Sequence, residues 1–264
     1  MNRILYGTPH FIGGAAPLSA GFGGGDGLLC GRATGCAAGM RAGAGAKSLA
    51  ESTWAEIAAV SAAGEAAGRW SVGDEKDITL TTGETLTLQI YGFDHDDLGG
   101  GAGKAGITFG MKNLMAATRV MHSATSNTGG FTSMTFYTWI TGTFIPSLPA
   151  DLQAVLKTVA KKSSAGNKST SISTNQVRVF LFAEIEVLGS VNLSVAGEGK
   201  VYPIFTDDAS RVKSLANGTG DLGSWWGRSP ALSSTFRFAA FTNVGDVTSI
   251  TTTYASGVCL GFCV

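Results

Sequence analysis

The string WWGRSP, at Trp225–Pro230, says most about how this chain folds. Tandem tryptophans ahead of Arg-Ser-Pro are typical of a strand that packs into a core, where side chains alternate between the two faces of a sheet. Alternation would bury one indole and expose the other, so a sugar-stacking platform is the alternative role. We expect Trp225 and Trp226 to be structural residues.

The chain ends in a second informative string, YASGVCLGFCV, at Tyr254–Val264. On an extended strand Cys259 and Cys263 would share one face about 13 Å apart, which is beyond the reach of a disulfide. The other two cysteines, Cys30 and Cys36, lie in a Gly-rich region, and a chain of 264 residues does not depend on disulfides for stability. We expect buried free thiols.

Alternating apolar residues predict short strands in the last third of the chain. The predicted strands are Val177–Gly189, Thr235–Val244, Ser249–Ala255 and Gly257–Val264. A hairpin is predicted further upstream at Asp77–Gly92, with its turn at Gly83 and Glu84.

Helical signals precede most of these strands. Thr53 and Glu56 form a capping-box pattern, which predicts a helix that runs to about Ala67. Other helices are predicted at Met111–His122, at Phe131–Ile145 with Pro146 and Pro149 ending it, and at Asp151–Lys161 with lysines at its C-terminal end. Helices followed by brief strands indicate an α+β fold.

The first 50 residues differ in composition from the rest. Met1–Ala50 is dense in Gly and Ala, as in GFGGGDG at Gly21–Gly27, and has almost no periodic apolar pattern. Composition alone is typical of a disordered tail. We interpret residues 1–50 as an assembly arm that packs against other subunits, with a long loop wrapped on its own domain as the alternative; residues 51–264 form the folded domain.

Composition and charge exclude several classes of partner. Charged residues make up only 14% of the chain, Gly reaches 38 residues and the net charge is zero, which suits packing within a large assembly. Without a basic excess, no nucleic-acid partner is expected. No apolar run is long enough for a membrane-spanning helix, and the start lacks the features of a secretion signal, so neither membrane insertion nor conventional secretion is expected.

Two stretches could carry chemistry. Asp94, His95, Asp96 and Asp97 could bind a hard cation or orient a base, but no nucleophile motif accompanies them, so we favour a structural role. The Gly-rich Leu98–Gly106 lacks the first spaced glycine of a phosphate loop and has Ala105 where Ser or Thr would bind magnesium, which favours a surface turn. Zinc is not expected either, since His10, His95 and His122 supply too few convergent ligands, and we expect no cofactor.

Several strings together resemble a family of phage and prophage tail or fibre-tip proteins of Gram-positive hosts. These are TWAEIAAVSAAGEAAGRWSVGDEK (Thr53–Lys76), YGFDHDDL (Tyr91–Leu98), KAGITFGMKNLM (Lys104–Met115), LPADLQAVLKTVAKK (Leu148–Lys162), WWGRSP and GVCLGFCV. The resemblance implies a compact C-type-lectin-like domain with a small twisted antiparallel sheet. It also implies a place in the virion, contact with other virion proteins, and self-association, most simply as a homotrimer.

The resemblance further implies roles for individual residues. Because the family signature holds both DHDD and WWGRSP, we expect Arg228 to be buried and paired with Asp94 or Asp96. The stretch from Pro230 to Gly257 mixes Ser, Thr, Asn and aromatic residues, as binding faces do. By resemblance, receptor contacts are expected at Phe236, Arg237, Phe238, Asn243, Thr251, Thr252 and Tyr254; ordinary Thr-rich strand surface is the alternative.

Two functions from different classes remain. One is a non-enzymatic virion adhesin that binds a host cell-surface glycan or protein. The other is a purely structural virion component, such as a capsid decoration or tail-tip fitting. An enzymatic role, suggested by the formylglycine-generating relatives of the lectin-like fold, ranks last because Cys259 and Cys263 lie in an apolar strand without an activating base.

Overall fold

The computed structural model describes residues 47–101, 103–216 and 218–264. The predicted arm, with Cys30, Cys36 and His10, therefore lies outside the described residues except at 47–50. Leu49, within that short stretch, already belongs to the hydrophobic core. The described residues form several small antiparallel sheets and short helices, which confirms the α+β prediction.

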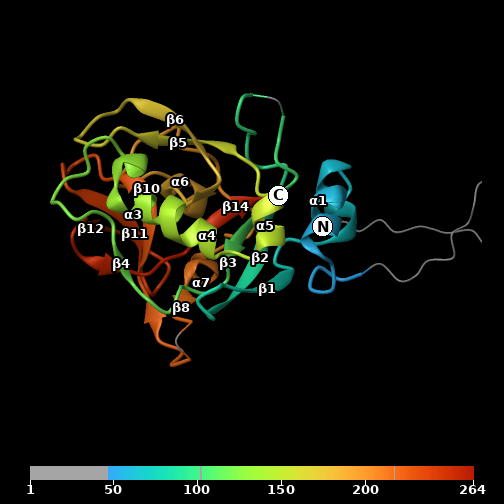
Figure 1. Ribbon diagram of the computed structural model, residues 1–264. Helices are drawn as coiled ribbons and strands as arrows, with labels where there is room; N and C mark the ends of the chain where they lie inside the picture. Colours follow the sequence, from blue (N-terminus) through green and yellow to red (C-terminus); the bar gives the residue numbers. More distant parts are fainter. Residues whose placement is uncertain (1–46, 102, 217) are drawn as a thin grey trace, which may run out of the picture. The chain divides into compact units, whose positions relative to one another are not determined.

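The largest sheet has five strands in the order β1-β2-β3-β14-β7, all antiparallel to their neighbours (Figure 1). Its strands are β1 (Glu75–Thr79), β2 (Thr85–Phe93), β3 (Ile107–Met111), β14 (Gly261–Cys263) and β7 (Val179–Phe180). The chain's last strand thus lies inside the sheet, with Phe262 opposite Phe109. This position explains why the final string is so apolar: Gly257–Val264 is buried throughout.

WWGRSP forms the first strand of a second sheet, ordered β10-β11-β12. The strands are β10 (Trp225–Pro230), β11 (Arg237–Phe241) and β12 (Val247–Thr251). Three two-stranded ribbons complete the strands: β5 (Val159–Ser164) with β6 (Ile172–Val177), β13 (Ala255–Ser256) with β4 (Arg119–Val120), and β8 (Lys213–Ser214) with β9 (Leu222–Gly223).

The helices are short and are fixed by local signals. The predicted capping box is confirmed at α1, where Thr53 Oγ1 accepts the Glu56 amide and the Glu56 carboxylate accepts the Thr53 amide. The helices are α1 (Trp54–Ala62), α2 (Ala66–Arg69), η1 (Phe131–Ser133), α3 (Thr135–Trp139), η2 (Ile140–Phe144), α4 (Ile145–Ser147), α5 (Ala150–Val155), α6 (Glu184–Leu188) and α7 (Asp208–Arg211). In the part of the chain that the structure describes, none of them is long and apolar enough to cross a membrane.

Several predicted elements differ from the structure. The helix predicted to run to about Ala67 ends at Ala62, with α2 following separately, and the helix predicted at Phe131–Ile145 is divided into η1, α3, η2 and α4, with Pro146 inside α4. The helix predicted at Met111–His122 is wrong: the segment contains the end of β3, irregular chain and the short strand β4, and its backbone amides bond to distant carbonyls, as Met115 N does to Val258 O at 3.0 Å. The helix predicted at Asp151–Lys161 ends at Val155, after which the chain becomes β5. The strand predicted at Val177–Gly189 is a short strand followed by α6, which ends at Gly189 with φ 74°.

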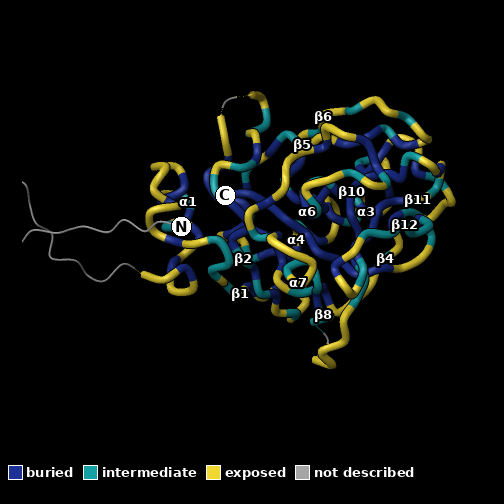
Figure 2. The backbone as a smooth tube through the Cα atoms, turned by 180° about the vertical axis from the view of Figure 1, so that it is seen from behind, coloured by how far each residue is buried: buried dark blue, intermediate teal, exposed yellow. Residues whose placement is uncertain are grey.

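Both tryptophans of WWGRSP are fully buried, so the expectation that only one would be buried is wrong. Their indole N–H groups stay bonded in the core: Trp225 Nε1 donates to Arg211 O at 3.0 Å and Trp226 Nε1 to Arg119 O at 2.7 Å. Strand β10 is buried along its whole length (Figure 2), and β5, α6 and η1 contact it in addition to its partner strand β11. The two described cysteines, Cys259 and Cys263, are buried free thiols as expected.

Candidate functional site

A buried ion pair joins the WWGRSP strand to α6. Arg228, only 1% exposed, donates to both carboxylate oxygens of Glu186, and its Nη2 lies 2.8 Å from Glu186 Oε1. The remaining guanidinium donors bond to backbone carbonyls of Lys162, Leu181 and Glu198. The predicted burial of Arg228 is confirmed, but the predicted partner is wrong, because Asp94 is exposed and Asp96 pairs elsewhere.

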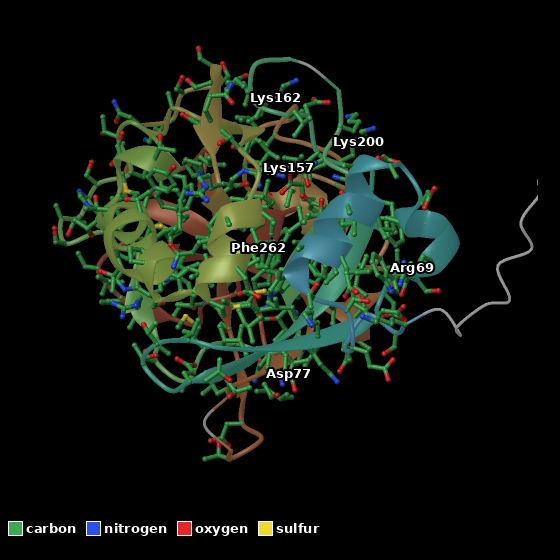
Figure 3. All side chains as sticks on the ribbon, turned by 45° about the vertical axis from the view of Figure 1, so that its right-hand side comes forward. Arg69, Asp77, Lys157, Lys162, Lys200 and Phe262 are labelled. Carbon is green, nitrogen blue, oxygen red and sulfur yellow. The ribbon has the colours of Figure 1, made fainter. Side chains whose placement is uncertain are left out.

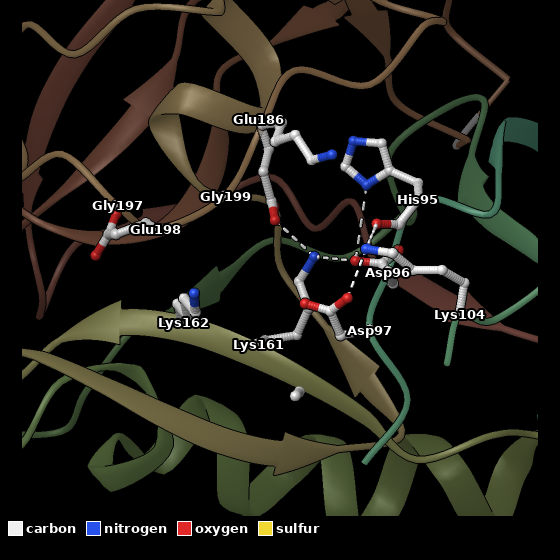
Figure 4. A pocket seen from close by; sticks show the side chains of 12 residues that line it. His95, Asp96, Asp97, Lys104, Lys161, Lys162, Glu186, Gly197, Glu198 and Gly199 are labelled. Atoms are coloured by element: carbon white, nitrogen blue, oxygen red, sulfur yellow. Dashed lines mark hydrogen bonds and ion pairs between the residues drawn. The ribbon is translucent and has the colours of Figure 1, made fainter. Parts of the chain in front are cut away.

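Lys161 extends this ion pair into a network. Its ammonium lies 2.6 Å from Glu186 Oε1 and 2.6 Å from Asp96 Oδ1, between the two carboxylates (Figure 4). Asp96 also accepts hydrogen bonds from Thr108 Oγ1 at 2.6 Å and from Tyr202 OH at 2.8 Å. Two cations thus neutralise two carboxylates inside the core, which is the condition under which buried charges are tolerated.

The network keeps its carboxylates ionised despite their burial. Burial acts to raise the pKa of Asp96, but the Lys161 ammonium, the nearby His95 and hydrogen bonds from Lys161 and Thr108 outweigh it and hold the pKa well below its usual range. Burial also acts to raise the pKa of Glu186, but the charges of Arg228 and Lys161 outweigh it and lower the pKa. Glu198 differs, because burial outweighs the nearby Arg228 charge and raises its pKa.

A pocket of about 260 Å³ opens beside this network. Its wall includes the imidazole of His95, which stacks on the Tyr202 ring with centroids 3.9 Å apart. At the rim, Lys104 pairs with Asp97 at 2.5 Å, while Lys162 and Lys200 add positive charge near the Gly-rich turn (Figure 3). The acidic and basic groups at the bottom of the pocket, Asp96, Lys161 and Glu186, form salt bridges with one another. The pocket is therefore lined by a salt-bridge cluster whose charges are already paired.

The Asp94–Asp97 and Leu98–Gly106 stretches, whose residue types could carry chemistry, have structural roles beside this pocket. Asp94 has a left-handed backbone with φ 47° at the end of β2, and Asp97 forms an isolated β-bridge with Lys104 that closes the Gly-rich turn. Among the described residues, no three or more His, Cys, Asp or Glu side chains are grouped to hold a metal ion.

Residues 105–264, more than half of the chain, match a family model described as a domain of unknown function, DUF6273. The chain belongs to the DUF6273 family. No curated protein and no solved structure matches it. Lys161, Glu186 and Arg228 lie inside the DUF6273 region, whereas Asp96 precedes it, so the charge network connects this region to the β1–β2 hairpin segment.

The predicted contact residues do not form one patch in the DUF6273 domain. Phe238 and Thr252 are fully buried, so both are removed from the contact set. Asn243 is exposed in the turn between β11 and β12. The other four gather at the opposite end of these strands, where Arg237 pairs with Thr251 and Phe236 O accepts the Thr252 amide: Phe236, Arg237, Thr251 and Tyr254.

Sequence reasoning missed Lys161, Glu186, Glu198 and Tyr202. The sequence pattern predicts a helix at Lys161 and a strand at Glu186, so it does not connect either residue with Arg228. A weak signal exists in VAKKSS at Val159–Ser164, where Lys161 alternates with Val159 and Ser163 on the buried face of β5. The alternation of buried and exposed positions along β5 indicates that Lys161 is buried, but its partners, Asp96 and Glu186, come from distant segments.

Proposed function

We propose that this DUF6273 protein is a non-enzymatic virion adhesin, with a C-type-lectin-like domain that binds a host surface receptor. The resemblance of WWGRSP, GVCLGFCV and the upstream strings to phage tail proteins supports the virion setting and association with other virion proteins and further copies of the chain. The low charge content supports such an assembly. No cofactor is required for this role.

One observation carries the choice of binding face. Tyr254 is 68% exposed, the highest value among the large hydrophobic side chains of the described residues. A tyrosine offers a rigid ring and a hydroxyl group, which suits contact with glycans and proteins. Together with Phe236, Arg237 and Thr251 it defines the Tyr254 face, which we place against the receptor.

Binding of the purified chain to whole host cells tests this function. Tyr254→Ala should abolish most of the binding, whereas Asn243→Ala, at the opposite end of the same sheet, should leave it intact. Equal loss in both variants would contradict the assignment of the face. Failure of the folded, unmodified protein to bind cells would instead favour the structural virion component.

A further inference from the structure

A second pocket lies next to the Tyr254 face. It has a volume of about 390 Å³ and is lined by Thr118, Arg119, Val120, Thr135, Phe136, Trp139 and Ala255. Ala255 follows Tyr254 directly and pairs with Val120 across the β13–β4 ribbon. The pocket therefore begins one residue along the chain from Tyr254.

Arg119 dominates the chemistry of this pocket. Its guanidinium carbon lies 3.8 Å from the centroid of the Trp139 ring, which fixes the side chain in place. Among the described residues that line the pocket, Arg119 alone carries a charge, and its guanidinium forms no hydrogen bond or ion pair with any described residue. Burial lowers the pKa of Arg119, and the nearby charge of Glu84 partly opposes this effect.

The accessible part of the Arg119 guanidinium lacks an acceptor. Arg119 Nε and Trp139 Nε1 are buried under the stacked side chains and cannot be reached from the pocket. The Nη groups of Arg119 are not buried and have no hydrogen-bond partner among the described residues. An unpaired cation that is open to the pocket indicates a ligand that supplies acceptor oxygens and negative charge.

The residues that line the pocket indicate which class of anionic ligand it binds. A guanidinium matches the flat, singly charged carboxylate group, and one cation balances one negative charge rather than the two of a phosphate monoester. The hydroxyl groups of Thr118 and Thr135 add polar contacts, and Val120, Phe136 and Ala255 add apolar ones. Hydroxyl, apolar and cationic groups together suit an oxidised sugar ring better than an extended acidic peptide.

Building on the proposed adhesin function, we propose that the Arg119–Trp139 pocket binds the carboxylate of an acidic sugar residue in a surface glycan. The carboxylate would accept hydrogen bonds from the Nη groups of Arg119. The sugar ring would lie against the hydroxyl and apolar lining, and the rest of the glycan would extend over the Tyr254 face.

Titration calorimetry of the full chain with three acidic probes tests the proposal: a galacturonate trimer, a hyaluronan tetrasaccharide and sialyllactose. We expect at least one to bind and its carboxyl-reduced, neutral counterpart to bind roughly 10- to 100-fold more weakly. Galactose 6-phosphate tests whether a phosphate group can replace the carboxylate, and it should compete poorly with the acidic probe. No binding by any of the three acids, or equal binding of acid and neutral forms, would overturn the proposal.

Variants locate the site. Arg119→Gln should weaken binding of the acidic probe by roughly 10- to 100-fold, whereas Trp139→Phe, which keeps an aromatic ring beneath Arg119, should change it by less than roughly 3-fold. Arg69→Gln is the matched control, because exposed Arg69 also lies over a tryptophan, 5.2 Å from the Trp70 centroid. Equal weakening in Arg69→Gln would contradict the proposal, and thermal unfolding checks that each variant is folded.

A whole-cell arm separates this proposal from the adhesin function. Cell binding that is lost in Tyr254→Ala but unchanged in Arg119→Gln would keep the adhesin and overturn the acidic-sugar pocket. Probe binding that depends on Arg119, without any binding to cells, would overturn the adhesin and keep the pocket.

Discussion

Lys161 Nζ and Asp96 Oδ1 lie 2.6 Å apart in the core, although the two residues are 65 positions apart in the chain. The same ammonium reaches Glu186, which in turn bonds to Arg228. Lys161 is thus the bridge between the carboxylate that precedes β3 and the arginine of WWGRSP. Segments that share no local sequence signal are connected through this one side chain.

Removing the bridge should destabilise the fold strongly. Lys161→Met leaves Asp96 and Glu186 with less compensation, and loss of one partner from a buried ion pair costs about 3–5 kcal/mol. Lys162→Met is the matched control, because Lys162 is exposed on the same strand and should change the free energy of unfolding by less than about 0.5 kcal/mol. Urea unfolding measures both; similar effects would show that the network adds little.

The network should also make stability depend on pH. The pKa values of Asp96 and Glu186 are lower in the folded chain than their ordinary values of 3.8 and 4.5, so the unfolded chain binds more protons in acid. Their stabilisation is fully present above those ordinary values and is lost as the pH falls below them. Unfolding free energy measured between pH 6 and pH 3, roughly bracketing these values, should fall toward acid, and more gently in Asp96→Asn. A parallel slope in that variant would contradict this assignment.

Glu198 should give the unfolding free energy the opposite dependence on pH. Because its pKa is raised by burial, its contribution to stability is present at low pH and is lost as the pH rises through the raised value. Glu198→Gln should remove this loss and give a flatter unfolding free energy on the alkaline side of the ordinary value of 4.5. The matched exposed variant is Glu65→Gln, which should change the unfolding free energy by less than about 0.5 kcal/mol.

The two C-terminal thiols should react slowly in the folded protein. Burial raises the pKa of both Cys259 and Cys263, and the thiolate is the reactive form. In a Cys30→Ser, Cys36→Ser variant, an aromatic disulfide reagent should label the remaining thiols only when denaturant is added. Rapid labelling under native conditions would show that the end of the chain opens readily.

Phe238 and Tyr254 should separate stability from binding. Phe238→Ala opens a cavity in the core and should cost about 3–5 kcal/mol of unfolding free energy, with the folded fraction still able to bind cells. Tyr254→Ala should change stability by less than about 0.5 kcal/mol while reducing binding. Thermal unfolding and cell binding are measured for both variants on the same samples. The reverse pattern would contradict the assignment of the Tyr254 face to receptor binding.

Local features of the fold were predictable from the sequence. The capping box at Thr53 and Glu56, the hairpin through β1 and β2, and the two buried thiols in the last six residues are confirmed. These features depend on neighbouring residues: a cap needs two side chains three positions apart, and a hairpin needs alternation on both sides of a turn.

Long-range pairing was decided only by the tertiary structure. The apolar spacing of Met111–His122 fits a helix, yet amides there bond to carbonyls such as Val258 O, which lies far along the chain. Likewise Arg228 needed a buried carboxylate, but several acidic residues satisfied that need equally well in the sequence. Only the folded chain brings Glu186 to the guanidinium and Trp139 to Arg119, because such contacts depend on how distant segments pack rather than on local periodicity.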